Sequence, residues 1–493
     1  MIIASLLPQK KEDIIAIKDL RILPECIEFR LDTIDLDEAL EALQHVSCKK
    51  IAACRRQEDG GSYRGSEKER TAILEKAIHS ALFDYIDVEM DSESFSLFKK
   101  HPKKRFIISY HDIKETPDDI TGKYRRLCSL KGASFYKIVT YAKAIADNLK
   151  IKEVLKSARS DKLPLISFCM GEKGMLSRIL CMSWGSKGVY ASIKRGRETA
   201  AGQISHGELM QSFDIERIDP STKIFAVLGY PLKHSLSPAV HNAAYRSLNL
   251  HYACIPFETR DLEEVFDLVE DIHIAGFAIT SPLKEKAMNF AATIENDARR
   301  IGSVNTIIAE GSQFSAYNTD WRAFLRELLE SVPDLKNEKI AVLGDGGVAH
   351  AVAHALKKQE ASFSIFSRNK IKGEEIAQRY ESSWQHIEGL ADFDYSVLVN
   401  CTTAGMYPEE DSSPIGEESL RGRFFYDLIY NPPVTKLMKM AMSKGIEVKN
   451  GKGMFLGQAA LQFELLTGQK APGEVMERAF QEGLHFLDKE NDG

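Results

Sequence analysis

The sequence predicts an α/β protein whose first half is a (β/α)8 TIM barrel and whose second half forms two further α/β domains. Three observations lead to this prediction. Short apolar stretches alternate with helical patterns through the first half, a glycine-rich turn joins a strand to a helix in the second half, and a polar segment containing a proline separates the halves at residues 214–222. Alternating strands and helices are typical of parallel sheets covered by helices.

Eight apolar stretches in the first half have the length and composition of strands. They are Ile2–Leu7, Cys26–Asp32, Lys50–Arg55, Tyr85–Glu89, Arg105–His111, Phe135–Thr140, Leu165–Met170 and Val189–Lys194. Helical patterns lie between them, such as Leu36–Val46, Glu67–Phe83, Asp118–Leu130 and Ala144–Ser157. Eight successive strand–helix units predict a closed parallel barrel, with tight loops because this fold typically takes ~250 residues.

The domain boundaries follow from the same pattern. The barrel is expected to cover residues 1–213, and residues 214–222 are expected to form a linker. A new apolar stretch, Lys223–Gly229, follows the linker. A resemblance described below implies that the second half divides into a substrate-binding domain of residues 223–319 and 454–493 and a nucleotide-binding Rossmann domain of residues 320–453.

Composition limits the possible functions. The 493 residues suggest two or three domains, and 44% hydrophobic and 28% charged residues are ordinary for a soluble protein. The net charge of −6 gives no basic surplus for nucleic acid, and no apolar run has membrane-spanning length. The N-terminus has the pattern of a first strand rather than a signal peptide. The eight cysteines contain no C-x-x-C pair, so we expect reduced thiols in a cytoplasmic protein. No obligate protein partner is evident from the sequence.

Lys137 and His111 are the first candidates for catalysis. Lys137 lies inside an apolar stretch, and His111 ends the preceding one. An ammonium group is costly to bury, so one reason to place a lysine there is to keep the amine neutral and nucleophilic. A histidine nearby can shuttle protons. The pair therefore indicates Schiff-base chemistry on a ketone.

Further polar residues gather near the ends of the predicted strands, where the functional side chains of such barrels lie. They are Glu28, Arg30, Asp32, Arg55, Asp87 and Glu89. Asp32, Asp87 and Glu89 could equally be members of buried ion pairs. We favour catalysis over ion pairing for Lys137 and His111, because neither has a carboxylate neighbour in its own strand.

At these positions the first half resembles the type I 3-dehydroquinate dehydratases. The shared motifs are Glu28-Phe-Arg30-x-Asp32, Arg55 before Gly60-Gly61, Ser109-Tyr-His111-Asp112, Tyr136-Lys137, Gly174-Met-Leu-Ser-Arg178 and Thr199-Ala-Ala-Gly-Gln203. The resemblance implies that Lys137 forms an imine with the substrate ketone, and that His111 acts as general base and then as general acid.

The same resemblance implies how substrate is held. Arg178, Thr199 and Gln203 would bind its carboxylate, a task that suits a planar guanidinium. Glu28 and Arg55 would bind ring hydroxyls, and Arg30 is counted with the substrate-binding residues. The family usually has glutamate before the glycine pair to orient the histidine, whereas this chain has Asp59 there.

The second half carries three fragments that indicate another active site. Ser235 and Ser237 flank the start of a predicted helix, where they could clamp a carboxylate or simply cap the helix. Thr280-Ser-Pro-Leu-Lys284 follows a strand, and Ser303-Val-Asn305 precedes Tyr317-Asn-Thr-Asp320. Lys284 and Asp320 could relay a proton, or could be a surface ion pair of little worth.

A glycine-rich turn, Gly344-Asp345-Gly346-Gly347, then joins a strand to a helix and predicts a phosphate site at the helix N-terminus. It departs from G-x-G-x-x-G, because Ala349 stands at the third glycine position. The next strand ends at Arg368-Asn-Lys370, where basic residues favour the 2′-phosphate of NADP over NAD. No metal site is expected: His350 and His354 have i,i+4 spacing but no obvious third ligand.

These fragments resemble shikimate dehydrogenase in the same order. Asn400-Cys-Thr-Thr-Ala-Gly405, Asp427-Leu-Ile-Tyr430 and Gly453-Met454-x-x-x-Gln458 extend the match. The resemblance implies a catalytic pair, Lys284 and Asp320. It also implies a carboxylate site of Ser235, Ser237, Thr280 and Tyr430, and ring-hydroxyl contacts from Asn305, Asp320 and Gln458. The implied NADP contacts are Gly344, Gly346, Gly347, Arg368, Lys370 and Gly453.

The two resemblances imply consecutive reactions, in which 3-dehydroquinate loses water and the resulting 3-dehydroshikimate is reduced to shikimate with NADPH. Two alternatives stay open. One is a catabolic quinate/shikimate dehydrogenase that could use NAD, against which Arg368 and Lys370 argue. The other is a non-enzymatic sensor, against which the presence of all four catalytic residues argues.

Overall fold

The computed structural model describes residues 1–491 except 21, 233–234 and 312. Two compact units divide the chain. The first holds residues 1–223, 251–273 and the C-terminal segment from 485, and the second holds residues 224–250 and 274–484. No described helix combines the length and the apolar composition that crossing a membrane requires.

The first unit contains the predicted barrel. Its strands are β1 (Ile2–Leu6), β2 (Cys26–Arg30), β3 (Lys49–Ala53), β4 (Tyr85–Glu89), β5 (Phe106–His111), β6 (Phe135–Tyr141), β7 (Leu165–Met170) and β8 (Val189–Ser192). They form one parallel sheet in the order β7-β6-β5-β4-β3-β2-β1-β8, and its two ends approach each other, so that the barrel nearly closes. The prediction of eight parallel strands is confirmed, with shifts of a few residues at the ends.

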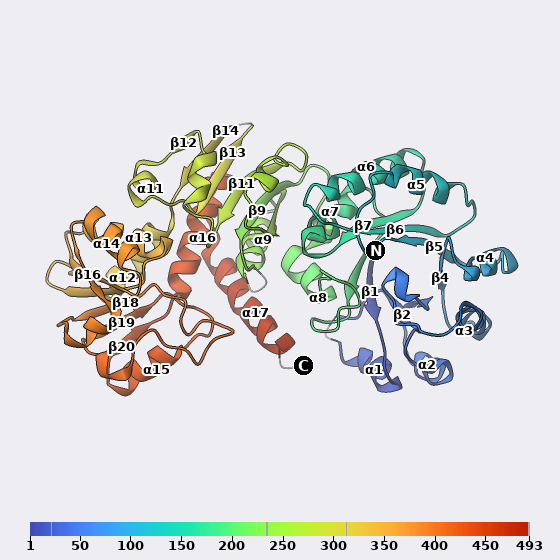
Figure 1. Ribbon diagram of the computed structural model, residues 1–493, viewed down its shortest axis with the longest axis horizontal. Helices are drawn as coiled ribbons and strands as arrows, with labels where there is room; N and C mark the ends of the chain where they lie inside the picture. The colour runs from blue at the N-terminus through green and yellow to red at the C-terminus, as the bar shows by residue number, and fades with distance from the viewer. Residues whose placement is uncertain (21, 233–234, 312, 492–493) are drawn as a thin grey trace. The chain divides into compact units, whose positions relative to one another are not determined.

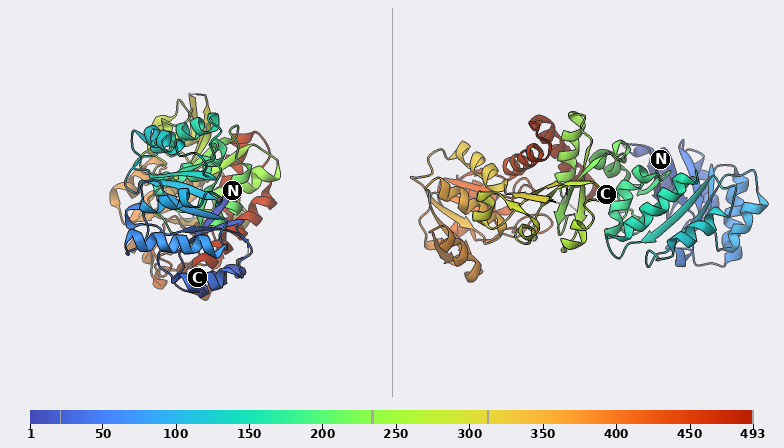
Figure 2. Two further views of the ribbon diagram at one scale, coloured as in Figure 1. Left: turned by 90° about the vertical axis from the view of Figure 1, so that its right-hand side faces the viewer. Right: turned by 90° about the horizontal axis from the view of Figure 1, so that it is seen from above.

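Helices surround these strands on the outside (Figure 1 and Figure 2). They are α1 (Lys11–Ile15), α2 (Leu36–Leu43), α3 (Glu67–Ser80), α4 (Ser96–Lys100), α5 (Ile120–Cys128), α6 (Asp147–Ser160), α7 (Met175–Trp184) and α8 (His206–Glu208). Helix α3 begins in a capping box, in which Ser66 and Glu69 satisfy each other's backbone amides. Apolar residues of the strands and helices, such as Phe29, Leu74 and Ile78, form a shared core.

The predicted strand after the linker is β9 (Lys223–Gly229). It belongs to a six-stranded sheet in the order β10 (Tyr252–Glu258), β9, β11 (Ile274–Ile279), β13 (Thr306–Glu310), β14 (Gln313–Tyr317) and β12 (Thr293–Ile294). The sheet is mixed, because β9 and β11 run parallel whereas β13 is antiparallel to both of its neighbours.

Outside the third sheet's own connections, the second half contains the helices α9 (Ser237–Ser247), α10 (Glu263–Phe266), α11 (Asn296–Ile301), α12 (Asp320–Ser331), α16 (Lys452–Thr467) and α17 (Gly473–Asn491). Helix α12 packs into the core of the third sheet through Trp321, Phe324 and Leu328. Helix α9 has Pro238 in its first turn, where the missing amide hydrogen costs no helical hydrogen bond.

The third sheet has Rossmann topology. Its order is β17 (Ser383–His386), β16 (Ser362–Ser367), β15 (Lys339–Leu343), β18 (Val397–Asn400), β19 (Phe424–Asp427) and β20 (Glu447–Lys449), with every neighbouring pair parallel. Helices α13 (Gly347–Lys358), α14 (Lys370–Arg379) and α15 (Lys436–Ser443) connect its strands. The strand order reverses between β15 and β18, which is where such sheets bind nucleotides.

Candidate active sites

The barrel holds a cavity of about 200 Å³ near the carboxyl ends of its strands. Its lining includes Lys137, His111, Arg178, Glu28 and Gln203, which come from separate parts of the first half. The resemblance assigned all five to catalysis or substrate binding. The fold therefore brings the predicted residues of the first half into one pocket.

Lys137 lies at the centre of this pocket and is 2% exposed. Its Nζ is 2.6 Å from Asp87 Oδ2 and 3.4 Å from Glu28 Oε2. The face of the Tyr190 ring lies 4.3 Å from the same nitrogen. The expectation that Lys137 avoids ion pairs is wrong, because β2 and β4 point carboxylates into the barrel beside β6. A lysine's partners in a barrel come from other strands, not from its own.

Arg55 completes the buried charge network. Its Nη2 lies 3.0 Å from Asp87 Oδ2, and its Nη1 lies 3.1 Å from Glu89 Oε1. Burial alone would raise the pKa of Asp87, but Arg55 and Lys137 hold it well below its usual range. The ion-pair interpretation of Asp87 and Glu89 is thus confirmed. It is also confirmed for Asp32, whose Oδ2 lies 2.5 Å from Arg30.

His111 faces the same network. Its Nδ1 lies 3.1 Å from Arg55 Nη1, and because a guanidinium can only donate, Nδ1 must accept. The proton of the neutral imidazole is therefore on Nε2. Burial lowers the pKa of His111 well below its usual value, and the nearby cations Arg55 and Lys137 lower it further. The ring is a neutral base at pH 7.

The expected orienting carboxylate of His111 has a different partner. Asp59 accepts a hydrogen bond of 2.6 Å from Arg56 Nε. Arg56 also pairs with Asp91, at 3.0 Å. Arg55 thus contacts the ring nitrogen directly, whereas Asp59 fixes the loop that lines the pocket.

Arg178 is a buried cation whose hydrogen bonds in the described part of the chain go only to backbone oxygens. Its Nη1 and Nη2 donate to the carbonyls of Tyr190 and Ala201, each at 3.2 Å, and its Nε has no partner there. Burial lowers its pKa to about 10. An unpaired buried guanidinium is unfavourable without a ligand. It is therefore suited to an anionic substrate group, as the sequence predicted.

Thr199 and Gln203 lie beside this guanidinium in the lining of the cavity. The backbone amide of Thr199 donates to Gln203 Oε1 at 2.7 Å, and the Thr199 hydroxyl donates to Ser5 at 2.9 Å. The two predicted carboxylate contacts are thus fixed to each other and to β1.

The second site gathers around Lys284 and Asp320. Lys284 Nζ lies 2.5 Å from Asp320 Oδ2, and the two side chains are only 13% and 6% exposed. Asn305 Nδ2 donates to the other carboxylate oxygen at 2.8 Å and approaches Gln458 Oε1 at 3.4 Å. Four predicted site residues therefore share one network. The alternative of an exposed ion pair is excluded by their burial.

The predicted carboxylate clamp is spread over three elements. Ser235 and Ser237 lie at the start of α9, where the Ser237 amide donates to the Ser235 hydroxyl at 3.4 Å. Thr280 directly follows β11, and Tyr430 follows β19 and packs on Phe455 with ring centres 4.8 Å apart. Burial raises the pKa of Tyr430 to about 12, so its hydroxyl stays protonated and can donate. Their convergence on one carboxylate remains a prediction.

The glycine loop between β15 and α13 has the geometry of a phosphate cradle. Gly344 has φ +111°, which few other residues adopt. A Cβ added at Gly346 would meet nothing within 4 Å, so this backbone is open to a ligand. A Cβ added at Gly347 would lie 3.7 Å from Lys284 Cδ, which places the loop beside the predicted catalytic pair.

The other residues predicted to contact NADP differ in their exposure to solvent. Arg368 and Lys370 are exposed at the end of β16, where the ribose of a dinucleotide is expected. Gly453 is packed, because a Cβ there would lie 1.9 Å from Glu327 Oε2. The close approach of α16 to α12 explains this glycine, and a role in cofactor binding stays a prediction.

Three residues near the two sites were missed from the sequence. Tyr190 covers Lys137, Ser109 donates to Asp87 at 2.6 Å, and Thr319 accepts from Asn305 Nδ2 at 2.8 Å. Tyr190 and Ser109 occupy strand positions, and Thr319 directly precedes Asp320. From the sequence, Tyr190 and Ser109 could have been found only by asking which side of each strand faces the barrel interior. Thr319 could have been found only because it is next to Asp320.

The comparisons with known proteins agree with this geometry. Residues 2–220 match the family model for type I 3-dehydroquinase. Residues 227–307 match the shikimate dehydrogenase substrate-binding domain, and residues 451–479 match the shikimate 5′-dehydrogenase C-terminal domain. The chain thus combines a lyase module with an oxidoreductase module.

Individual relatives extend the match across both modules. The bifunctional 3-dehydroquinate dehydratase/shikimate dehydrogenase of Arabidopsis thaliana is 31% identical over 480 residues, 92% of this chain and 79% of that protein. The NADP(+) shikimate dehydrogenase of Caldanaerobacter subterraneus is 35% identical over 51% of this chain and 94% of its own length. A shikimate dehydrogenase crystallised with NADP+ superposes with a TM-score of 0.51 at 33% identity, over 54% of this chain and 97% of that one. The chain belongs to the bifunctional 3-dehydroquinate dehydratase/shikimate dehydrogenase family.

Replacing Arg178 is predicted to weaken substrate binding without lowering the stability of the fold. Replacing Arg178 with Met should raise the KM for 3-dehydroquinate about 10–100-fold, since hydrogen bonds to charged groups contribute roughly 1.5–3 kcal/mol. The melting temperature should stay equal or rise, because the variant no longer buries an unpaired charge. Steady-state kinetics and calorimetry measure the two effects. Arg178→Lys, which keeps the charge, is the control, and an unchanged KM in Arg178→Met would refute the assignment.

Proposed function

We propose that the barrel dehydrates 3-dehydroquinate through an imine at Lys137. The observation that carries this proposal is one buried cavity holding an amine, a neutral imidazole and an unpaired guanidinium. The amine attacks the ring ketone, and the carbinolamine loses water to give a protonated imine. His111 then removes a proton from the neighbouring carbon with Nδ1, once Arg55 has released its hydrogen bond to that nitrogen, and the imine accepts the electron pair. His111 returns the proton to the departing hydroxyl, and water hydrolyses the product imine to free Lys137.

The carboxylates around Lys137 position the amine and stabilise the imine. Before substrate binds, the oxygens of Asp87 and Glu28 hold the Lys137 side chain in place, at 2.6 and 3.4 Å from its Nζ. Because Arg55 and Lys137 keep Asp87 ionised, this carboxylate stabilises the positive charge of the imine once it has formed. Arg178 fixes the substrate carboxylate, so that the ketone meets Lys137.

The second module is proposed to reduce 3-dehydroshikimate to shikimate. Lys284 supplies positive charge and a proton at the ketone oxygen, and Asp320 holds the lysine in position. Asn305, fixed to Asp320, and Gln458 bind ring hydroxyls. The glycine loop and the basic end of β16 fit NADP, which supplies the hydride when bound, and Arg368 and Lys370 would contact its 2′-phosphate.

The proposed partners of the chain are these small molecules, without nucleic acid or membrane. We propose a cytoplasmic location, for which the support is that all eight cysteines are free thiols. The basic pair at the end of β16 favours biosynthetic reduction with NADPH over a catabolic, NAD-dependent oxidation. The filled catalytic positions of both modules favour an enzyme over a sensor.

A coupled assay tests the two-step proposal. Wild-type protein with 3-dehydroquinate and NADPH should show enone absorbance followed by loss of NADPH. Lys137→Ala should form no enone but still oxidise NADPH when 3-dehydroshikimate is supplied. Lys284→Ala should accumulate enone, with reduction slowed roughly 10²–10⁴-fold, the usual cost of losing a positioned proton-transfer group. Loss of both activities in either folded variant would contradict two independent sites.

Cofactor choice gives a separate prediction. Replacing Arg368 and Lys370 with Gln should raise the KM for NADPH about 10–100-fold, because charge-assisted bonds to the 2′-phosphate are lost. The KM for NADH, which lacks that phosphate, should change little. Lys372→Gln is the matched control, since Lys372 is also exposed and lies in the same helix as Lys370. A wild-type preference for NADH would refute the assignment.

A further inference from the structure

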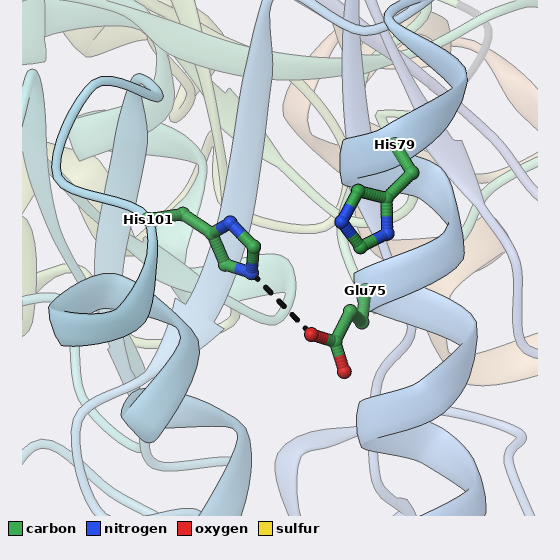
Figure 3. Close-up of side chains that lie close together, drawn as sticks. All are labelled: Glu75, His79 and His101. Carbon is green, nitrogen blue, oxygen red and sulfur yellow. Dashed lines mark ion pairs between the residues drawn. The ribbon is translucent and has the colours of Figure 1, made fainter.

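A group of two histidines and a glutamate lies on the outside of the barrel, away from the barrel's catalytic pocket. Glu75 and His79 are one turn apart on α3, and His101 follows α4 (Figure 3). One possible ligand atom from each residue lies within 4.8 Å of those of the other two. Residues at i and i+4 project from the same face of a helix, so α3 presents two ligands toward the third.

The three side chains of this group contact one another. His101 Nε2 lies 3.5 Å from Glu75 Oε1, is itself buried, and has no hydrogen-bond partner in the described part of the chain. The rings of His79 and His101 meet edge to face with centres 5.5 Å apart. Lys100 also pairs with the glutamate, but its side chain is 62% exposed and can move into solvent.

We propose that Glu75, His79 and His101 form a binding site for a divalent transition metal such as Zn²⁺. Two imidazoles and one carboxylate are ligands that zinc prefers, at about 2.0–2.2 Å, and water would complete a tetrahedral site. The ligand atoms need to close in by only a small movement. Exposed His79 can rotate into place, while Glu75 is held on a 14-residue helix.

The position of these three residues predicts that a bound metal would stabilise the barrel and take no part in catalysis. His79 lies at the end of α3, before β4 begins, and His101 lies before β5 begins. Both therefore lie at the amino ends of the strands, opposite the catalytic pocket, where features of such barrels serve stability. A bound metal would join α3 to the segment that enters β5. It should raise the melting temperature and leave both kcat values unchanged.

Zinc titration of the untagged full-length protein tests the proposal. Calorimetric titration with ZnCl₂ should show one site per chain in the micromolar range or tighter. Zinc at about 100 times its Kd should raise the melting temperature of the dehydratase transition by roughly 5–10 °C. His79→Ala and His101→Ala should each weaken binding at least about tenfold. His45→Ala, at an exposed histidine after α2, is the matched control and should bind like wild type.

The Lys100→Ala variant is expected to bind zinc more tightly, a result that a folding defect could not produce. This variant removes the cation that shares the carboxylate with the metal, so zinc should bind several-fold more tightly than in wild type. Metal-free melting temperatures of all variants check that each one is folded. Equal zinc affinity in wild type, His79→Ala and His101→Ala would overturn the proposal, and so would weaker binding in Lys100→Ala.

Discussion

The buried ion network around Lys137 is the constraint on which the dehydratase site depends. Lys137 and Arg55 face Glu28, Asp87 and Glu89, and each of these five residues is at most 3% exposed. Burying so many charges is costly unless every cation meets its carboxylate, and removing one partner of such a pair typically costs about 3–5 kcal/mol. The barrel meets this requirement because successive parallel strands point these side chains into one interior. The network fixes the amine, and through Arg55 it fixes the imidazole.

The second module uses the same principle with fewer charges. Asp320 holds Lys284, and Asn305 fixes Asp320 in turn. In each site a lysine is positioned by a carboxylate from another segment of the chain, beside the residues predicted to bind substrate. The proposed task of the lysine differs, since it is a nucleophile in the barrel and a proton donor beside the glycine loop. Each site draws its residues from its own module, so we expect each to act alone.

The sequence predicted the elements better than their contacts. Strand patterns located β1–β8 to within a few residues, and β9 without error, since apolar period and turn residues are local properties. The pairing of Lys137 with Asp87 could not be predicted, because it depends on which strand ends meet across the barrel. The same holds for the contact of His111 with Arg55, and for Gly453, which is explained by the nearby Glu327. The proposed metal site could not be predicted either, because Glu75 and His79 lie on α3 whereas His101 follows α4.

Borohydride trapping tests the central claim, that the amine held in this network is the nucleophile. Protein incubated with 3-dehydroquinate and sodium borohydride is digested and mapped by mass spectrometry. We expect one substrate-dependent adduct, on Lys137, together with loss of dehydratase activity and retained reduction of 3-dehydroshikimate. Absence of an adduct, or an adduct on another lysine, would contradict the account.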